Sequence, residues 1–301
     1  MKILITGGMG FIGLHLVDYL LKKGNKIIVL DNFSNSNKNL IKKIQNKNLR
    51  IIEGDIRKID DIVNSMENQE VVIHLAAKIS VNESIENPNE TFDVNVNGTK
   101  NVLKACKKNN IKKLIVASSA AVYGENTSQS KLKEISKTNP ISPYGESKLL
   151  MENEINKFQI KNSNLNCIIL RFFNIFGKGQ SSEYAGVITK FIEKISTNES
   201  IEIFGDGLQE RDFISVDDVI ESIFNAMKNG TGGTYNIGSG KTTTINDLAK
   251  VIISISKKNI KISHLSPKKG DIKFSGADIT LAKNEIKYSP KFGLENIKEL
   301  L

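Results

Sequence analysis

The sequence is poor in the residues that form disulfides and bind transition metals. Its 301 residues include two cysteines and three histidines. Cys106 falls in a predicted helix and Cys167 in a predicted strand, so each is expected to be a small buried apolar side chain and not half of a disulfide. With so few thiol and imidazole ligands, we expect no metal site.

The sequence also lacks a long apolar run. No segment approaches the roughly 20 apolar residues of a membrane helix, and residues 1–6 already read as a strand, which leaves no room for a signal peptide. We therefore expect a cytoplasmic protein with no membrane partner. An apolar content of 39% is enough for one large domain, or for one domain with a smaller lobe.

A basic stripe with interleaved aromatic residues, the usual footprint of a nucleic-acid-binding protein, is absent as well. The net charge of +9 comes from 42 lysines and arginines against 33 acidic residues, and most of the excess is lysine scattered over helices and loops. We expect no nucleic-acid partner. The general positive field still favours an anionic substrate.

What the chain does have is a glycine-rich turn directly after its first predicted strand, Lys2–Thr6. Gly7 permits a tight turn, Gly10 allows the backbone to approach a pyrophosphate, and Gly13 lets the following helix pack against the sheet. That helix, predicted over 11–23, directs its free N–H groups and the positive end of its dipole toward the phosphates.

An acidic residue stands where such a fold binds ribose. Asp31 ends the second predicted strand, 26–30, eighteen residues beyond Gly13, and a carboxylate there accepts hydrogen bonds from the adenosine ribose. The same charge repels the 2′-phosphate of NADP. The order of strand, glycine loop, helix, strand and acid therefore predicts an NAD site.

Strands and helices continue to alternate after this point, with strands at 50–53, 71–75 and 113–118 and helices at 60–66 and 91–109. This alternation predicts an α/β fold, a Rossmann-type doubly wound parallel sheet. Ligands of such sheets bind at the carboxyl ends of the strands. The segments 54–56, 75–78 and 118–119 follow strands in this way and are candidates for that edge.

A tyrosine and a lysine stand four residues apart in the stretch 142–148, SPYGESK. Ser142 is suited to cap a helix there and Pro143 to occupy its first position, which places Tyr144 and Lys148 on one helix face. A free tyrosine has a pKa near 10, and a neighbouring cation would make it a usable base. The alternative is a surface pair without chemical function.

Motifs along nearly the whole chain carry a family resemblance. They are ITGGMGFIG (5–13), Asp31, GDI (54–56), HLAA (74–77), DVNVNGTKNVL (93–103), ASSAAVYG (117–124), SPYGESK (142–148), LRFFNIFG (170–177), GDGLQERDFISVDD (205–218), YNIGSG (235–240) and KKGDIKFSGAD (268–278). The sequence resembles the NAD-dependent sugar epimerase/dehydratase family of extended short-chain dehydrogenases/reductases, and within it most closely the UDP-sugar 4-epimerases. The glycine loop is shared by many nucleotide enzymes, whereas the serine, tyrosine and RDFISVDD motifs are specific to this family.

The resemblance assigns roles position by position. The cofactor-binding residues it implies are Gly7, Gly10, Phe11, Ile12, Gly13, Asp31, Asp55, Ile56, Leu75, Ala76, Ala77, Asn95, Tyr144 and Lys148. The catalytic residues it implies are Ser119, Tyr144 and Lys148. The substrate-binding residues it implies are Ser119, Tyr144, Asn174, Val187, Phe204, Arg211, Lys268 and Ser275. Phe204 would stack on uracil, and Asn174 and Arg211 would donate to the diphosphate. Taken alone, Phe204 also fits an ordinary core position, and Arg211 also fits an ion pair with Asp212.

Two of these positions bear on the substrate. Lys268 stands where the family usually has arginine, and lysine does not make the bidentate phosphate contact of a guanidinium. Ser275, seven residues later, matches the position beside the sugar C2 substituent. Because serine leaves room there, we expect N-acetylated UDP-hexoses to be accepted as well as plain ones.

The resemblance implies NAD-dependent epimerisation at C4 of a UDP-hexose through a 4-keto intermediate. It also implies an NAD-binding domain at 1–171, to which some later segments return, a sugar-nucleotide lobe at 172–301, and a homodimer formed through the helices around 91–109 and 142–161. A 4,6-dehydratase would need Asp-Glu where this chain has Ala120 and Ala121. Decarboxylation stays open, and so does a non-catalytic NAD-sensing regulator, although such a regulator would typically have lost Tyr144 or Lys148.

Overall fold

The computed structural model describes residues 1–36, 38, 46–126, 128–180, 186–268 and 270–301. Its strands are β1 Lys2–Thr6, β2 Lys26–Asp31, β3 Leu49–Glu53, β4 Val71–His74, β5 Lys113–Ser119, β6 Asn166–Phe172, β7 Asn174–Phe176, β8 Ile201–Phe204, β9 Glu210–Ser215, β10 Gly233–Ile237, β11 Thr242–Thr244, β12 Ile262–Leu265 and β13 Phe274–Ser275. Its helices are α1 Phe11–Lys22, α2 Ile59–Met66, α3 Val81–Glu86, α4 Pro88–Phe92, η2 Asp93–Gly98, α5 Thr99–Lys108, η3 Ala120–Val122, α6 Pro143–Lys161, α7 Val187–Ser196, α8 Val216–Asn229, α9 Ile245–Ser256, α10 Thr280–Ile286 and η4 Leu294–Glu299.

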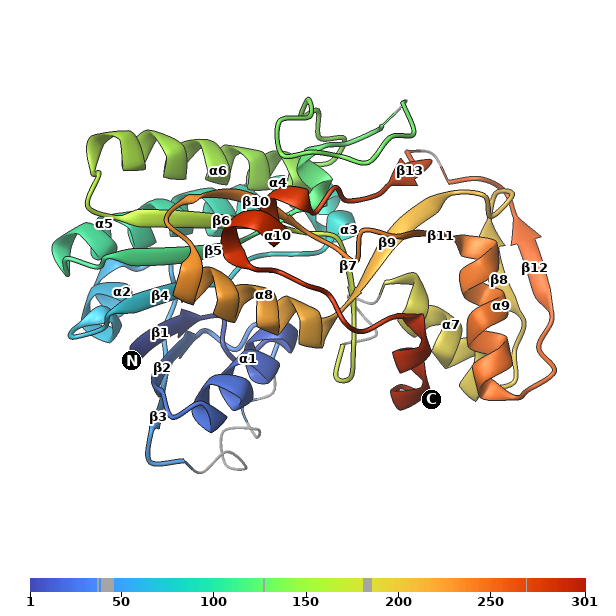
Figure 1. The fold of residues 1–301 in the computed structure, drawn as a ribbon, viewed down its shortest axis with the longest axis horizontal. Coiled ribbons are helices and arrows are strands. Elements are labelled where there is room, and N and C mark those ends of the chain that lie inside the picture. The colour runs from blue at the N-terminus through green and yellow to red at the C-terminus, as the bar shows by residue number, and fades with distance from the viewer. Residues whose placement is uncertain (37, 39–45, 127, 181–185, 269) are drawn as a thin grey trace.

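Seven parallel strands form the central sheet, in the order β10-β6-β5-β4-β1-β2-β3 (Figure 1). The strand order reverses between β1 and β4. In doubly wound sheets, ligands bind in the crevice at such a reversal. The predicted α/β, Rossmann-type sheet is confirmed.

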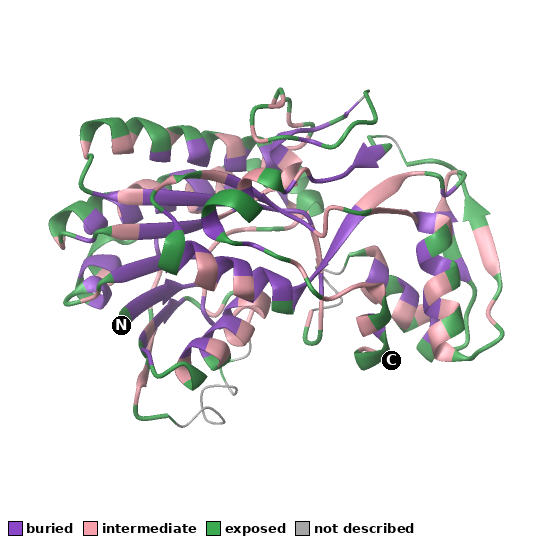
Figure 2. Ribbon diagram, viewed as in Figure 1, coloured by how far each residue is buried: buried purple, intermediate pink, exposed green. Residues whose placement is uncertain are grey.

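Alternate residues of each strand face opposite sides of the sheet, and the two sides build two cores. On one side, Leu4 and Leu114 pack with α2, α5 and α6. On the other side, Ile3 and Ile115 pack with α1 and α8. Figure 2 shows the strands buried between helices whose outer faces are exposed.

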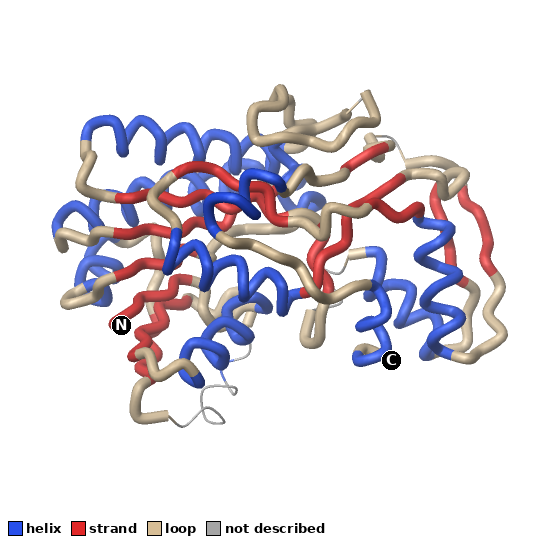
Figure 3. Tube along the Cα trace, in the orientation of Figure 1, coloured by secondary structure: helices blue, strands red, loops and turns tan. Residues whose placement is uncertain are grey.

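A smaller lobe lies at the end of the molecule that holds the C-terminus (Figure 3). Strands β7, β9, β11 and β13 form one of its sheets, and β8 pairs with β12 in another. Its core consists mostly of side chains from α7, β8, α9 and η4, including Phe191, Ile203, Leu248 and Ile297. The lobe is α/β, as predicted.

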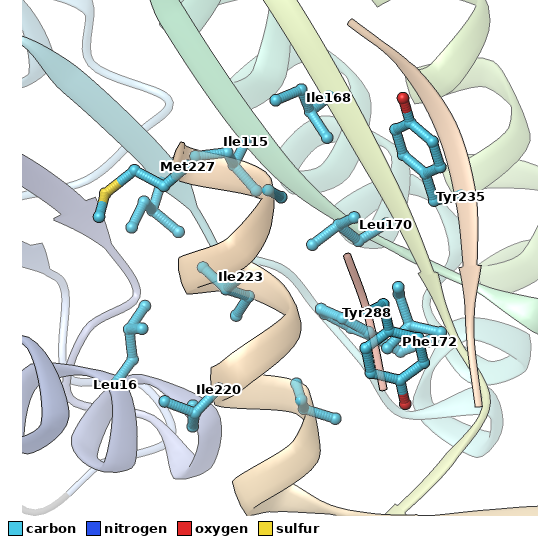
Figure 4. Close-up of a cluster of buried hydrophobic side chains, with 14 of the residues drawn as sticks. Leu16, Ile115, Ile168, Leu170, Phe172, Ile220, Ile223, Met227, Tyr235 and Tyr288 are labelled. Atoms are coloured by element: carbon cyan, nitrogen blue, oxygen red, sulfur yellow. The ribbon is translucent and has the colours of Figure 1, made fainter. Parts of the chain in front are cut away.

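The chain returns from this lobe to the central sheet. Strand β10 is the edge strand next to β6, and α8 packs against α1. Figure 4 shows Ile220 and Ile223 of α8 between Leu16 of α1 and the strands of the sheet. The central domain is therefore built from residues both before and after position 171.

The helix predicted over 91–109 is three consecutive segments. The chain runs from α4 into η2, a turn of π-helix, and then into α5. Single π-helical turns within α-helices are often found at functional sites. Asn95 and Val96 lie in this turn and are buried.

The two cysteines lie in the core, as expected. Cys106 and Cys167 are both buried and free, and burial raises the pKa of both thiols. Over the ranges that the structure describes, no helix has the length and apolar character needed to cross a bilayer.

Candidate active site

A cavity of about 640 Å³ lies along the carboxyl edge of the central sheet. This volume is in the range of small-molecule sites. Many of the predicted cofactor and catalytic residues line it: Gly7, Gly10, Phe11, Ile12, Gly13, Asp31, Asp55, Ile56, Leu75, Ala76, Ala77, Ser119, Tyr144, Lys148 and Asn174.

The glycine loop forms the floor of this cavity, and its geometry requires glycine. Gly7 has a φ of +70°, and a Cβ there would lie 2.6 Å from the backbone nitrogen of Ala76. A Cβ at Gly13 would lie 2.5 Å from the carbonyl oxygen of Gly7. The turn after β1 therefore sits tightly against the segment after β4, and the first turn of α1 sits tightly against that turn. Because the first turn of α1 lines the cavity, this is a favourable place for a pyrophosphate.

The Asp31 carboxylate is fixed by the loops around it. It accepts hydrogen bonds from the backbone nitrogens of Met9 (2.9 Å) and Phe33 (2.8 Å) and from the hydroxyl of Ser36 (3.3 Å). Asp31 is only 8% exposed, and it lines the cavity together with Ser36. A buried carboxylate at the end of β2 fits an adenosine ribose.

Asp55 has a strong partner that the motif alone did not reveal. The Arg57 guanidinium forms an ion pair with it at 2.6 Å, and this contact lowers the pKa of Asp55 to about 2. Arg57 also lines the cavity. The carboxylate is thus charged at any physiological pH, and a basic group stands beside it.

Ser119 lies at the carboxyl end of β5, and Tyr144 and Lys148 lie in the first two turns of α6. All three line the cavity. Ser142 caps α6 by accepting a hydrogen bond from the backbone nitrogen of Gly145 (3.1 Å), with Pro143 at the first helical position, as predicted. Tyr144 is half-buried and Lys148 is buried. The ammonium of Lys148 donates a hydrogen bond to the carbonyl oxygen of Ala117 at 2.9 Å, and burial lowers the pKa of Lys148 to about 8.

Two opposing effects act on the pKa of the Tyr144 phenol. Burial raises this pKa, and the hydrogen bond with Ser119 partly opposes the rise. The ammonium of Lys148 donates to the carbonyl oxygen of Ala117. The expected effect of Lys148 on the phenol stays a prediction.

A buried chain of hydrogen bonds fixes His74 behind the glycine loop. Its Nδ1 lies 2.7 Å from the Thr6 hydroxyl and its Nε2 lies 3.0 Å from the Thr99 hydroxyl. Because the Thr99 hydroxyl donates to the carbonyl oxygen of Asn95 (2.7 Å), it accepts from His74, which leaves Nδ1 to accept from Thr6. Burial lowers the pKa of His74 to about 3, so the ring is neutral.

Asn95 lies beside the cavity, outside its lining. Its side chain accepts from the backbone nitrogen of Lys78 (2.8 Å) and donates to the carbonyl oxygen of Lys78 (2.9 Å) and to the Ser147 hydroxyl (2.9 Å). The amide thereby ties the loop after β4 to the catalytic helix α6.

The remaining predicted substrate residues lie in the smaller lobe. Val187 begins α7, Phe204 ends β8, and Ser275 in β13 is the register partner of Arg211 in β9. None of these lines the 640 Å³ cavity, and neither does Lys268. Of the predicted substrate-binding residues in this part of the chain, the cavity contains Asn174 alone.

The partner of Arg211 is Asp271, with 2.7 Å between Arg211 Nη2 and Asp271 Oδ1. The alternative ion pair with Asp212 is wrong. The Asp212 carboxylate instead accepts hydrogen bonds from the backbone nitrogens of Ser239, Gly240 and Ala277 and from the Ser239 hydroxyl. Asp212 thus joins β9 to two later segments.

Phe204 also has an internal partner. The ammonium of Lys268 lies 3.9 Å from the centre of its ring, a cation–π contact. Phe204 is half-buried. Lys268, which was predicted to bind the same nucleotide as Phe204, therefore covers one face of its ring.

The sequence reasoning missed several residues that line the cavity. They are Met9, Ser36, Arg57, Glu90, Phe172, Phe173 and Gln180. Ser36 follows Asp31 closely and Arg57 follows GDI, so their position after a strand end was the available signal. Lys78, in the candidate segment 75–78, also lines the cavity. Glu90 pairs with Lys78 at 3.4 Å from a separate helix, and no local pattern indicated it.

Two relatives match the chain over almost its whole length. A protein of Methanocaldococcus jannaschii named putative UDP-glucose 4-epimerase is 39% identical, covering 99% of this chain and 97% of its own. The UDP-glucose 4-epimerase of Bacillus subtilis is 32% identical, covering 99% of this chain and 94% of its own.

Solved structures agree with these relatives. The UDP-glucose 4-epimerase of Thermotoga maritima with UDP-glucose superposes with a TM-score of 0.93 at 35% identity, covering 99% of this chain and 96% of that one. The UDP-N-acetylglucosamine 4-epimerase of Methanobrevibacter ruminantium, in complex with UDP-N-acetylmuramic acid, gives 0.92 at 37% identity with the same coverage.

The family model described as NAD dependent epimerase/dehydratase family matches residues 3–238, which include the glycine loop, the Ser119, Tyr144 and Lys148 site and most of the central sheet. With the cavity geometry and the near full-length relatives, this match is decisive. The chain belongs to the NAD-dependent epimerase/dehydratase family.

Proposed function

We propose that this protein is an NAD-dependent UDP-hexose 4-epimerase. The observation that carries the proposal is the convergence of Ser119, Tyr144 and Lys148 on a cavity that also contains the glycine loop and Asp31. The proposed base (Tyr144), hydroxyl donor (Ser119) and cation (Lys148) thus line the same cavity as the residues proposed to bind the dinucleotide. Relatives and structural neighbours named as UDP-sugar 4-epimerases support the same reading.

The residues present fit NAD. The loop 7–13 would hold the pyrophosphate, Asp31 the adenosine ribose, and Leu75, Ala76 and Ala77 the wall between the two halves of the cofactor. Asp55 and Ile56 would border the adenine. When bound, NAD supplies a reversible hydride acceptor, and the sugar C4 is oxidised and later reduced again.

Tyr144 is the proposed base. As a phenolate it would take the proton of the sugar 4-hydroxyl during oxidation at C4, and it would return that proton during reduction from the opposite face. Ser119 donates a hydrogen bond to the same sugar oxygen. Lys148 supplies the positive charge that favours the phenolate once the site is filled.

Inversion requires the 4-keto sugar to turn while its nucleotide stays anchored. Asn174 and Arg211 are the proposed diphosphate ligands, and Phe204 is the proposed stacking partner of uracil. Lys268 would contact the phosphates in place of the family's arginine, and Val187 would be a neighbour of the nucleotide. Arg211 is half-buried and basic, and a guanidinium suits a diphosphate. Ser275, beside Arg211 in the sheet, is the proposed neighbour of the C2 substituent.

Dehydration is disfavoured by the residues after Ser119. Ala120 and Ala121 lie in the short helix η3, and a methyl group cannot transfer the protons that loss of the 6-hydroxyl requires. Decarboxylation and a purely NAD-sensing role are the competing candidates. Both predict no interconversion of UDP-hexoses.

We further propose a cytoplasmic homodimer. Its contact surface would include α5 and α6. Support comes from the apolar side chains Leu150 and Ile160 of α6, which are 39% and 84% exposed. Analytical ultracentrifugation would test the dimer.

We also propose that the NAD-binding half of each subunit comprises residues 1–171 with β10 and α8, and that the rest of the chain forms the half that binds the sugar nucleotide.

One experiment separates the candidates. Pure protein is incubated with UDP-glucose, UDP-galactose and their N-acetylated counterparts, and the products are separated and identified. Interconversion within either pair is expected. A UDP-uronate is incubated in parallel. Release of carbon dioxide from it without interconversion of any UDP-hexose, or NAD binding without any turnover, would overturn the proposal.

A further inference from the structure

A buried ion pair lies behind the catalytic residues, and the proposed reaction does not use it. Glu152 and Arg171 are 2% and 6% exposed, and Arg171 Nη2 lies 2.6 Å from Glu152 Oε2. Arg171 Nε is 3.0 Å from the other carboxylate oxygen. Burying two charges is expensive, and such pairs are often replaceable by apolar side chains without loss of stability. Stability alone is therefore a weak explanation for this pair.

Glu152 and Lys148 lie on the same face of α6. Both are buried on α6, one helical turn apart, and side chains with this spacing share a helix face. The carboxylate of Glu152 opposes the lowering of the Lys148 pKa that burial causes.

Three consecutive residues at the end of β5 meet three residues of α6. The carbonyl oxygen of Ala117 accepts from Lys148 (2.9 Å), and the Ser118 hydroxyl donates to Glu152 (2.5 Å). Ser119 shares a hydrogen bond with Tyr144. Glu152 is thus one of the points at which the catalytic helix is attached to the catalytic strand.

Arg171 attaches the same carboxylate to β6 and to the segment after β5. Its Nη1 donates to the Tyr123 hydroxyl (2.8 Å) and to the carbonyl oxygen of Glu134 (3.1 Å). The Tyr123 hydroxyl in turn donates to Asn236 Oδ1 (2.6 Å). Arg171 therefore has little freedom to move, and its charge balances that of Glu152.

We propose that Glu152 is a positioning residue: held in place by Ser118 and Arg171, its carboxylate lies on the helix face of Lys148 and favours the charged ammonium in a buried site. The inference rests on the roles that the proposed function gives to Tyr144 and Lys148. Removing the carboxylate leaves the lysine with no anion on its own helix face.

The groups around Lys148 define the expected direction of change. On its own helix these are Tyr144 and Glu152, from β4 the neutral His74, and from β6 Arg171. Burial lowers the pKa of Lys148 to about 8. Without Glu152 that pKa should fall further, so that Lys148 becomes neutral within the physiological range.

The test measures the ionisation of Lys148 directly in the NAD-loaded protein. Lysine labelled with carbon-13 at Cε is followed by NMR during a pH titration, and the Lys148 signal is identified by its loss in Lys148→Arg. We expect Glu152→Gln to lower the Lys148 midpoint by about one pH unit. Glu152→Asp, which keeps the carboxylate, should retain most of the parent midpoint.

Turnover of the sugar is the second readout. In Glu152→Gln the alkaline limb of the rate profile should move to lower pH by the same amount, with the KM for the sugar nucleotide unchanged. If Glu152→Gln fails to fold, the double variant Glu152→Gln/Arg171→Met, which leaves no unpaired buried charge, replaces it, and its midpoint should also fall.

The outcomes separate the two proposals. An unchanged Lys148 midpoint in the Gln variant, with activity reduced equally at every pH, would make the ion pair purely structural and overturn the inference. A lowered midpoint in a protein that interconverts no UDP-hexose would overturn the proposed function and leave the inference standing.

Discussion

Arg211 and Asp271 form an ion pair, with 2.7 Å between Nη2 and Oδ1, at the place proposed for the diphosphate of a nucleotide. Gln209 also donates to the Asp271 carboxylate, at 3.2 Å. Lys268 covers Phe204 in the same region. In the free protein both proposed nucleotide ligands, the guanidinium and the ring, therefore have an internal partner that a nucleotide would have to displace.

Asp271→Asn should bind UDP more tightly than the parent. Without the carboxylate, Arg211 has no anion to give up, and the repulsion between Asp271 and the diphosphate disappears. A gain of about three- to tenfold in affinity is expected, by isothermal titration calorimetry at low salt. Asp247→Asn is the matched control, because Asp247 lies on the exposed side of α9 paired with Lys250. Weaker UDP binding by Asp271→Asn would mean that Asp271 orients Arg211 for the ligand.

Tyr144→Phe should lose turnover and keep NAD. The change removes the proton acceptor and preserves the ring that packs at the start of α6. A loss of about 10²–10⁴-fold in kcat is expected from initial rates on the preferred UDP-hexose, with NAD content unchanged by absorbance. Tyr19→Phe on α1 is the control. A variant within tenfold of the parent would speak against general base catalysis by this residue.

Ser275→Tyr should narrow the range of sugars. Ser275 is 8% exposed, so a phenol ring at this position must occupy space that a C2 acetamido group would otherwise enter. Epimerisation of UDP-N-acetylglucosamine should be lost, and that of UDP-galactose should be retained. The retained activity is the internal control for folding. If the parent itself converts only plain hexoses, other residues close the pocket and the role of Ser275 is wrong.

Acid should destabilise the protein through His74. In the unfolded chain a histidine takes up a proton below a pH of about 6.5, whereas the buried ring stays neutral down to a pKa of about 3. Between these values the unfolded state binds more protons. The stability contribution of neutral His74 is thus complete above pH 6.5 and is lost as the pH falls toward 3, by at most about 1.4 kcal/mol per pH unit.

The measurement compares thermal unfolding of the parent and of His74→Gln at pH 7.5 and pH 5. The variant should be less stable at pH 7.5, because the hydrogen bonds to Thr6 and Thr99 are lost. The difference in unfolding temperature between parent and variant should be smaller at pH 5. His15→Gln, on the half-buried His15 of α1, is the control substitution. If this difference is the same at both pH values, protonation of His74 does not destabilise the folded protein, and the prediction is wrong.

Local patterns were enough to predict several residues that line the cavity. The glycine positions, the Asp31 strand end and the capped start of α6 each depend on residues within one turn, strand or helix. The family motifs then assigned Ser119, which shares the cavity with Tyr144 and Lys148. Parallel strands bring their ends to one edge, so this convergence follows once the sheet is predicted.

Pairings between distant segments were not predictable in the same way. Asp212, its neighbour in sequence, was the alternative partner considered for Arg211, yet the partner is Asp271, sixty positions away. The Glu152–Arg171 pair depends on how α6 packs on β6. The π-helical turn at Asp93–Gly98 lies inside an amphipathic pattern that an ordinary helix would satisfy equally well. Each of these depends on tertiary packing, which overrides local preference.

Strand β10 and helix α8 have a consequence for how the protein is made. During synthesis the residues of β1–β6 leave the ribosome long before those of β10. Because β10 pairs with β6 at the edge of the sheet, β6 has one unpaired edge until β10 has emerged. Domains normally fold as units during synthesis, N-terminal first. Here the central sheet is completed only after most of the chain has emerged, and until then the exposed strand edge is a place where chaperones would be expected to bind.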